Sequence, residues 1–138
     1  MDLKFFIHKG QYNFFLVFTM DFYTIHTKNE QTSQEAIAVK EGFNWYNLIF
    51  NFFWALYKQT WILATIYIAL QILLICLTYF DISPLIVRTL TMITYIMIAF
   101  QANDFYRYSL KLKGYKFKDI VLAKSSSHAI YNFLKKSS

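Results

Sequence analysis

Cysteine, glycine and proline are all scarce in this chain, and each shortage excludes a class of protein. The one cysteine among 138 residues excludes an intrachain disulfide and a cysteine cluster that binds zinc or iron–sulfur. This residue, Cys76, lies in the most apolar part of the sequence, where we expect a small apolar side chain. The three glycines are not clustered, which excludes a phosphate-binding loop, and with one proline they leave few turns for a many-stranded fold.

Charged and catalytic side chains are also in short supply. Charged residues make up 16% of the chain, against about a quarter in ordinary soluble domains, whereas hydrophobic residues make up 57% and aromatic residues 21%. The three histidines, His8, His26 and His128, do not have the spacing of metal ligands. Ser127 and His128 are adjacent, which is the wrong geometry for a nucleophile and its base, and no carboxylates are paired for acid–base work. The sequence therefore predicts no enzyme, no cofactor and no metal site.

An uncharged run of twenty residues, 61–80, is the strongest feature of what remains. As a helix it measures about 30 Å, which matches the hydrocarbon core of a bilayer. Eleven of its residues are Ile, Leu or Phe, and together they favour insertion by about 3–7 kcal/mol. A buried helix of a soluble protein can be equally apolar, but this chain lacks the amphipathic elements needed to surround one. The run predicts a transmembrane helix.

A second span is expected over residues 84–102, directly after a short turn. Ser83 suits the helix N-cap and Pro84 the first helical position. Arg88 opposes insertion, but it lies one turn from the end, where it can reach the interface or meet Asp81. Five lysines precede the first span and eight Lys or Arg residues follow the second, so the positive-inside rule places both chain ends in the cytoplasm. We expect a multi-pass membrane protein.

Residues 43–59 form an apolar stretch that is too short to span a membrane. At 100° per residue, its large apolar side chains share one face and its asparagines lie opposite. The stretch predicts an amphipathic helix that lies in the interface or re-enters the bilayer. Trp45 belongs to the apolar face. Trp54 falls near the polar face, which favours a protein contact at this position.

Short regular elements are predicted at both ends of the chain. Residues 21–27 predict a strand, and Thr32 with Glu35 forms a capping box for a helix that ends near Gly42, so that residues 20–42 form a strand–helix unit. The tail, 103–138, predicts a helix that ends at Gly114, a strand over 117–124 and a helix capped by a serine of 125–127. We expect the two units to pack together, with Ile25 near Val121, because a lone strand is marginal in water.

The fold class expected from these elements is mainly α and integral to the membrane. A two-helix transmembrane hairpin over 60–102 is preceded by the interfacial or re-entrant amphipathic helix, with short cytoplasmic strand–helix units at both ends. Residues 1–19 fit none of these elements and make a poor signal peptide. We expect them to be a disordered leader or an extension of a natural chain that begins at Met20.

Several short motifs occur in an order that resembles a bacterial membrane family known as domain of unknown function 2628. The resemblance covers roughly residues 22–135 and implies a membrane location without an activity. Asn51-Phe52 stands where the family has a Gly-Pro pair, so the helix break that the family implies there lacks its usual residues. The matching positions are Glu41, Gly42, Phe43, Trp45, Trp54, Ala55, Leu56, Asn103, Asp104, Gly114 and Tyr115.

Gln71 is the polar residue at the middle of the first span. Counted outward from the turn, Thr94 is its depth partner on the second span, and Thr91 lies one turn away. Gln71 is either a polar site in the membrane or one partner of an interhelical hydrogen bond worth about 0.6–2 kcal/mol. We favour the hydrogen bond.

Several of the candidate contact residues lie at the end of the second span or just after it. Asn103 and Asp104 lie where the helix leaves the bilayer, and the carboxylate either binds a partner, a cation or a proton, or pairs with Arg107. The basic residues that follow are interleaved with aromatic ones and predict contacts with anionic lipid headgroups; nucleic acid is a less favoured partner. The candidates for partner or lipid contact are Glu41, Trp45, Trp54, Asn103, Asp104, Arg107, Lys111 and Lys113.

The sequence thus favours a non-enzymatic accessory or scaffold subunit that docks a protein partner or anionic lipid. The alternative is a homo-oligomeric channel or transporter component, for which two spans per chain suffice. Its polar path would consist of Gln71, Thr89, Thr91 and Thr94, which is a thin supply.

Overall fold

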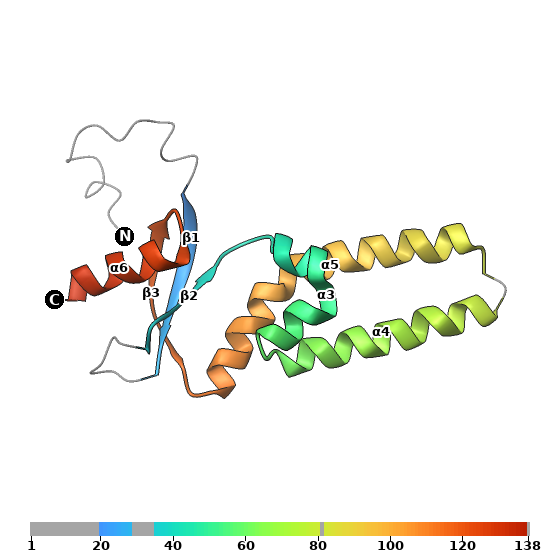
Figure 1. Ribbon diagram of the computed structural model, residues 1–138, viewed down its shortest axis with the longest axis horizontal. Coiled ribbons are helices and arrows are strands. Elements are labelled where there is room, and N and C mark those ends of the chain that lie inside the picture. Colours follow the sequence, from blue (N-terminus) through green and yellow to red (C-terminus); the bar gives the residue numbers. More distant parts are fainter. Residues whose placement is uncertain (1–19, 29–34, 81, 138) are drawn as a thin grey trace.

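A computed structural model describes residues 20–28, 35–80 and 82–137, which form a small sheet and a long helical hairpin (Figure 1). The hairpin extends away from the sheet, and the first and last described residues, 20 and 137, lie on the side of the sheet. The elements in chain order are β1 Asp21–Thr27, β2 Ile37–Lys40, α3 Trp45–Tyr57, α4 Trp61–Tyr79, α5 Pro84–Leu112, β3 Lys116–Ala123 and α6 Ser126–Ser137.

The sheet joins the two ends of the described chain. Its strand order is β2-β1-β3, and both pairings are antiparallel. Tyr23 lies opposite Val121 and Ile25 opposite Asp119, so the predicted pairing of the N-terminal and C-terminal strands is confirmed. Helix α6 covers one face, where Tyr23, Ile25 and Ala129 form a buried core. The Ser125 hydroxyl accepts a hydrogen bond from the His128 backbone N–H at 3.2 Å, as expected of an N-cap.

The helix predicted before Gly42 is wrong, because residues 37–40 are strand β2. Ile37 and Val39 are β-branched and lie opposite His26 and Thr24 of β1. Val39 is only 3% exposed, so pairing with β1 buries an apolar side chain that four residues of helix would leave without a partner. The cap residue Thr32 lies outside the described residues. Within its described residues, 20–28 and 35–42, the first unit is therefore two paired strands rather than a strand and a helix.

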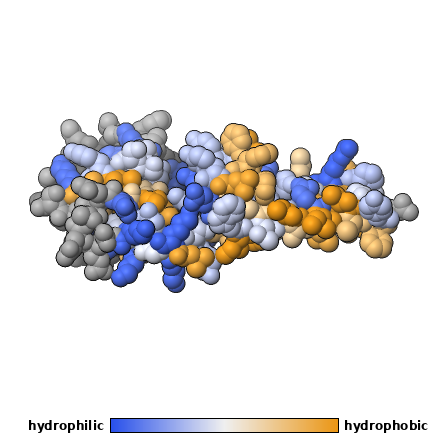
Figure 2. All heavy atoms as spheres, turned by 60° about the horizontal axis from the view of Figure 1, so that its bottom comes forward, coloured by the Kyte–Doolittle hydropathy of each residue, from blue (hydrophilic) through white to orange (hydrophobic). Residues whose placement is uncertain are grey.

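Helices α4 and α5 are both long and apolar enough to cross a membrane. In their most apolar windows only 22% and 17% of the residues are buried within the chain, whereas the core helix of a soluble protein would be mostly buried. Apolar residues gather over the helical half of the molecule, and most hydrophilic residues lie on the half with the sheet (Figure 2). The two halves therefore suit different surroundings.

Helix α5 continues beyond the hairpin to the sheet (Figure 1). Ser83 is its N-cap residue, although its side chain makes no capping hydrogen bond, and Pro84 is its first residue. It ends at Leu112, followed by Gly114 with φ of 88°, which confirms the predicted stop. The strand after it, β3, also agrees with the prediction. One helix thus connects the far end of the hairpin with the sheet.

Helix α3 confirms the predicted helix over 43–59 but contains a sharp kink. Asn51 has φ of 44° and ψ of −113°, a conformation that lies outside the left-handed helical region and that glycine adopts most easily. The helix break that the family implies is therefore present, although Asn51-Phe52 replaces the Gly-Pro pair.

Helix α3 buries part of its expected polar face against the other helices and leaves part of its apolar face exposed. Asn47, on the expected polar face, is fully buried against the other helices, whereas Trp45 and Phe53 on the apolar face are 65% and 74% exposed. Trp54 is 7% exposed and belongs to the core between α3, α4 and α5, so its protein contact lies within this chain.

Candidate functional site

Three asparagines connect the start of α3 with α5. The Asn44 Nδ2 donates to Asn103 Oδ1 at 2.7 Å, and Asn103 Nδ2 donates to the Gly42 carbonyl at 3.0 Å. Asn44 Oδ1 accepts from the Asn47 backbone N–H at 2.8 Å, which makes Asn44 the N-cap of α3. Both Asn44 and Asn103 are buried, so each hydrogen bond satisfies a group that water does not reach.

The same set of bonds extends to α4. The Tyr67 hydroxyl donates to Asn47 Oδ1 at 2.7 Å, and both side chains are at most 2% exposed. Among the described residues, Asn47 Nδ2 and Asn51 Oδ1 have no hydrogen-bond partner. The hydrogen bond between Tyr67 and Asn47 ties α4 to α3, whereas the open Asn47 Nδ2 is a buried donor whose lack of a partner costs stability.

Arg107 lies on α5 one turn beyond Asn103 and binds two strands of the sheet. Its Nε donates to Thr24 Oγ1 of β1 at 3.1 Å, and its Nη2 donates to the Lys40 carbonyl of β2 at 3.3 Å. Nη2 also pairs with Glu41 Oε1 at 2.7 Å, and Nη1 pairs with the Asp104 carboxylate. The planar guanidinium presents several donors in fixed directions, so one side chain reaches partners on three elements.

We define Asn44, Asn47, Tyr67, Asn103 and Arg107, with their partners, as the polar junction. It unites four of the predicted contact residues, Glu41, Asn103, Asp104 and Arg107. Sequence reasoning missed the roles of Asn44, Asn47 and Tyr67. An asparagine directly before an apolar run is an N-cap signal that pointed to Asn44, but no sequence signal pairs Asn47 with Tyr67.

The remaining predicted contact residues lie apart from the junction. Trp45 is exposed on the outer side of α3, and Lys111 is exposed near the end of α5. Lys113 donates to Gln59 Oε1 at 2.8 Å, which connects the end of α5 with the turn after α3. Trp54 packs edge-on against Tyr106 with 6.3 Å between ring centroids. The structure therefore separates the candidates that contact other elements of the chain from Trp45 and Lys111, which are exposed on the surface.

Gln71 forms an interhelical hydrogen bond, but its partner is not Thr94. Its Nε2 donates to the Tyr95 hydroxyl at 2.5 Å. Thr91 and Thr94 donate to carbonyls of their own helix, at Val87 and Leu90 respectively, as does Thr89 to Leu85. Arg88 is exposed near the start of α5, and Asp81, its proposed partner, lies outside the described residues.

Replacing Gln71 by leucine is expected to cost the hairpin about 0.6–2 kcal/mol, because it removes the bond to Tyr95. Tyr95→Phe should cost a similar amount, and the double variant should lose little more than either alone. Thr94→Val is the matched control, since its hydroxyl bonds within α5. Denaturant titration of the purified protein in detergent measures each change. Additive losses for Gln71 and Tyr95 would contradict the bond.

His26 is a titratable residue of β1 that lies near enough to Arg107 for its charge to act on it. Its side chain packs edge-on against Phe117, and its Nε2 is buried without a partner among the described residues. Burial lowers the pKa of His26, and the nearby charge of Arg107 lowers it further. The folded chain therefore favours neutral His26.

Stability is expected to fall in mild acid because of His26. The stabilisation is complete above the unfolded pKa of about 6.5 and is lost as the pH falls below this value toward the lowered pKa of the folded state. Thermal unfolding between about pH 8 and pH 5 measures the slope. His26→Gln should flatten that slope, and an unchanged slope in this variant would assign the pH dependence to another group.

The chemistry of the polar junction is that of a structural joint. Its donors and acceptors are mostly paired with one another. No group of three or more His, Cys, Asp or Glu side chains that could hold a metal occurs in the part of the chain that the structure describes. Arg107 neutralises the carboxylates of Glu41 and Asp104, which leaves neither as an isolated acid or base. The arrangement is suited to holding elements together.

Comparison with known proteins agrees with the family resemblance. The family described as "Protein of unknown function (DUF2628)" matches residues 6–111. This chain belongs to that family. The match starts earlier than the resemblance seen in the motifs and covers residues 6–19, and it ends close to the end of α5. The DUF2628 region thus includes the whole polar junction.

A curated relative of this chain is also described as uncharacterised. An uncharacterised protein of Rickettsia prowazekii (strain Madrid E) is 30% identical over 118 residues, which are 86% of this chain and 97% of the relative. No solved structure matches the chain. The relative carries no activity in its description, so the function has to be argued from the geometry.

Proposed function

We propose that this DUF2628 chain is a non-enzymatic scaffold of the bacterial inner membrane that holds a cytoplasmic sheet in a fixed position for a protein partner. Helices α4 and α5 form the membrane anchor, and the sheet lies on the cytoplasmic side. The low burial of both helices supports this arrangement. So does the distribution of basic residues, which gather before and after the hairpin.

The observation that carries the proposal is the polar junction. A flexible tether would be enough to keep a domain near the membrane. Here, instead, Arg107 binds both β1 and β2, and Asn103 binds the segment between β2 and α3. Such a joint restricts the orientation of the sheet as well as its distance from the bilayer. A restricted orientation is useful to a protein that presents a surface to a partner.

The surface most suited to a partner lies beside the junction. Asp104 retains 68% side-chain exposure even though it pairs with Arg107. It lines a cavity of about 350 Å³ together with Ile62, Gln101, Phe105 and Tyr108. Apolar walls with a few polar groups are typical of a binding cavity. Replacing Asp104 should therefore weaken the binding of a partner most without disturbing the core.

Purification from native membranes tests the proposal. We expect a defined protein to crosslink to the tagged chain and to be recovered at constant stoichiometry. Recovery should fall in Asp104→Ala and persist in Lys135→Ala, a control at the far end of α6. Recovery of the chain alone would count against a scaffold.

The same preparation tests the channel alternative. Thr89, Thr91 and Thr94 bond within α5 and form no hydrogen-bonded path between the helices. A homo-oligomer of fixed size that conducts ions in liposomes would nevertheless replace the scaffold by the channel.

A further inference from the structure

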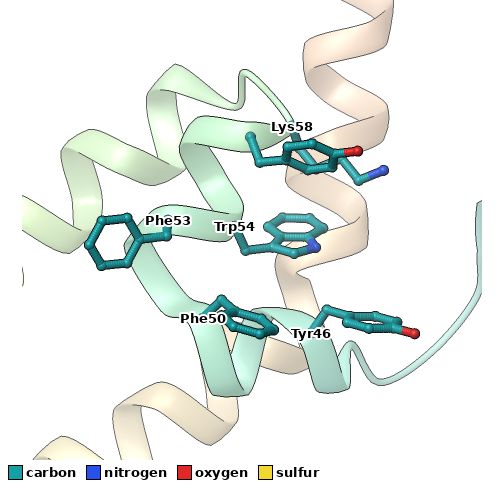
Figure 3. Close-up of a pocket in the computed structure, with 6 residues that line it drawn as sticks. Tyr46, Phe50, Phe53, Trp54 and Lys58 are labelled. Carbon is teal, nitrogen blue, oxygen red and sulfur yellow. The ribbon is translucent and has the colours of Figure 1, made fainter.

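One side of α3 carries an aromatic groove with a cation at one end. Figure 3 shows the rings of Tyr46, Phe50 and Trp54 following one another along the helix toward Lys58. The groove has a volume of about 480 Å³. Phe50 and Tyr57 are 54% and 81% exposed, so this aromatic surface is left open by the described part of the chain. Its lining residues are Tyr46, Phe50, Phe53, Trp54, Tyr57 and Lys58.

Lys58 lies against aromatic rings rather than against a carboxylate. Its Nζ lies 5.0 Å from the centre of the Tyr106 ring and 5.5 Å from that of Tyr57. No salt bridge joins Lys58 to any carboxylate among the described residues. Burial lowers its pKa, because the ammonium loses water that the rings replace only in part. An anion next to Lys58 would restore the lost stabilisation of its charge.

A second, more polar cavity continues from the first. It has a volume of about 490 Å³ and shares Tyr46, Trp54 and Lys58 with the aromatic groove. Lys40 and Lys124 also line it, whereas Asp21 is the one carboxylate among its lining residues. Asp21 pairs with Lys40 at 2.6 Å, which leaves Lys58 and Lys124 as the excess charge.

We propose that the two connected cavities bind one anionic phospholipid. Its phosphate occupies the polar cavity lined by Lys58 and Lys124, and an acyl chain lies along Phe50 and Tyr57. An amphiphile is the class of ligand that satisfies both halves, because a free anion would leave the aromatic groove empty and a neutral apolar ligand would leave the lysines unpaired. The proposal rests on the membrane anchoring argued above but not on the protein partner.

Titration of the purified full chain in detergent tests the site. Phosphatidylglycerol, phosphatidylcholine and glycerol phosphate are added separately, and native mass spectrometry counts the bound molecules while tryptophan fluorescence gives the affinity. We expect one phosphatidylglycerol per chain. Phosphatidylcholine should bind at least about fivefold more weakly, since each lysine contributes to binding the anionic headgroup.

Substitutions of the lysines that line the cavities test whether the lipid binds there. Lys58→Met should weaken phosphatidylglycerol about fivefold, and Lys58→Arg should restore it. Lys135→Met, which removes an equally charged residue on α6 outside both cavities, should change the affinity less than about twofold. Lys124→Met gives a second reading if Lys58→Met fails to fold.

Three outcomes would overturn the proposal: equal binding of phosphatidylcholine, an unchanged affinity in both lysine variants, or displacement of the lipid by glycerol phosphate at equal concentration. Each of these leaves the anchor intact. Removal of the chain from vesicles by carbonate would instead refute the membrane anchoring on which the site depends, so the two failures are distinguishable.

Discussion

Replacing Arg107 by methionine is expected to separate the sheet from the hairpin and to destabilise their contact by about 2–4 kcal/mol. The side chain is 19% exposed and bonds to Thr24, to the Lys40 carbonyl and to the Glu41 carboxylate. Methionine retains the length but none of the donors, so Glu41 loses its counter-ion and the two strands lose their tie to α5. The partial exposure of the carboxylates keeps the loss below that of a fully buried ion pair.

Pulsed electron resonance measures the separation directly. After Cys76→Ser, cysteines at Met92 on α5 and Tyr131 on α6, which are 72% and 61% exposed, accept spin labels. The unmodified junction should give one narrow distance distribution, and Arg107→Met a broad one. Arg88→Met is the matched control, because it removes an arginine from the same helix far from the sheet. A distribution that stays narrow in Arg107→Met would show that the junction does not set the orientation.

The second large effect is expected for Asn103→Leu, which should lower the free energy of unfolding by about 2–4 kcal/mol. Asn103 is 6% exposed and uses both ends of its amide, as acceptor for Asn44 and as donor to the Gly42 carbonyl. Leucine has the same branching pattern as asparagine and is somewhat larger, so the position stays filled. The cost arises because the buried Asn44 amide loses its acceptor and the Gly42 carbonyl loses its donor.

A double-mutant cycle with Asn44→Ala separates this bond from the helix cap that Asn44 also provides. The cap alone is worth about 1 kcal/mol, and we expect a coupling of about 1–2 kcal/mol between the two asparagines. Denaturant unfolding monitored by tryptophan fluorescence supplies the values, because Trp54 packs in the adjacent core. Strict additivity would mean that the two side chains stabilise the chain independently.

Features encoded locally were predictable from the sequence. The run from Trp61 to Phe80 and helix α4, Trp61–Tyr79, agree within one residue, since a long uncharged stretch has few alternatives to a helix. Gly114 marked the end of α5 because its positive φ suits glycine. The strand after it and the serine cap of α6 were equally local in origin.

Features that depend on a distant partner were not predictable. Residues 37–40 adopt a strand because β1 offers an edge with which Ile37 and Val39 pair, and this outweighs a capping motif upstream. Counting residues along the spans placed Thr94 opposite Gln71, but the Tyr95 hydroxyl extends further from its helix and reaches the amide first. The inward face of α3 was likewise set by Tyr67, which no pattern within α3 reveals.

The continuity of α5 has a mechanical consequence. At about 1.5 Å per residue, its 29 residues run from the outer end of the hairpin to the sheet without an interruption of helical geometry. In the proposed membrane arrangement, a bilayer thinner than the hairpin would force the helices to tilt, and α5, which is bonded to the sheet through Arg107, would turn the sheet with it. The proposed scaffold would thus convert membrane thickness into the angle at which its sheet is displayed.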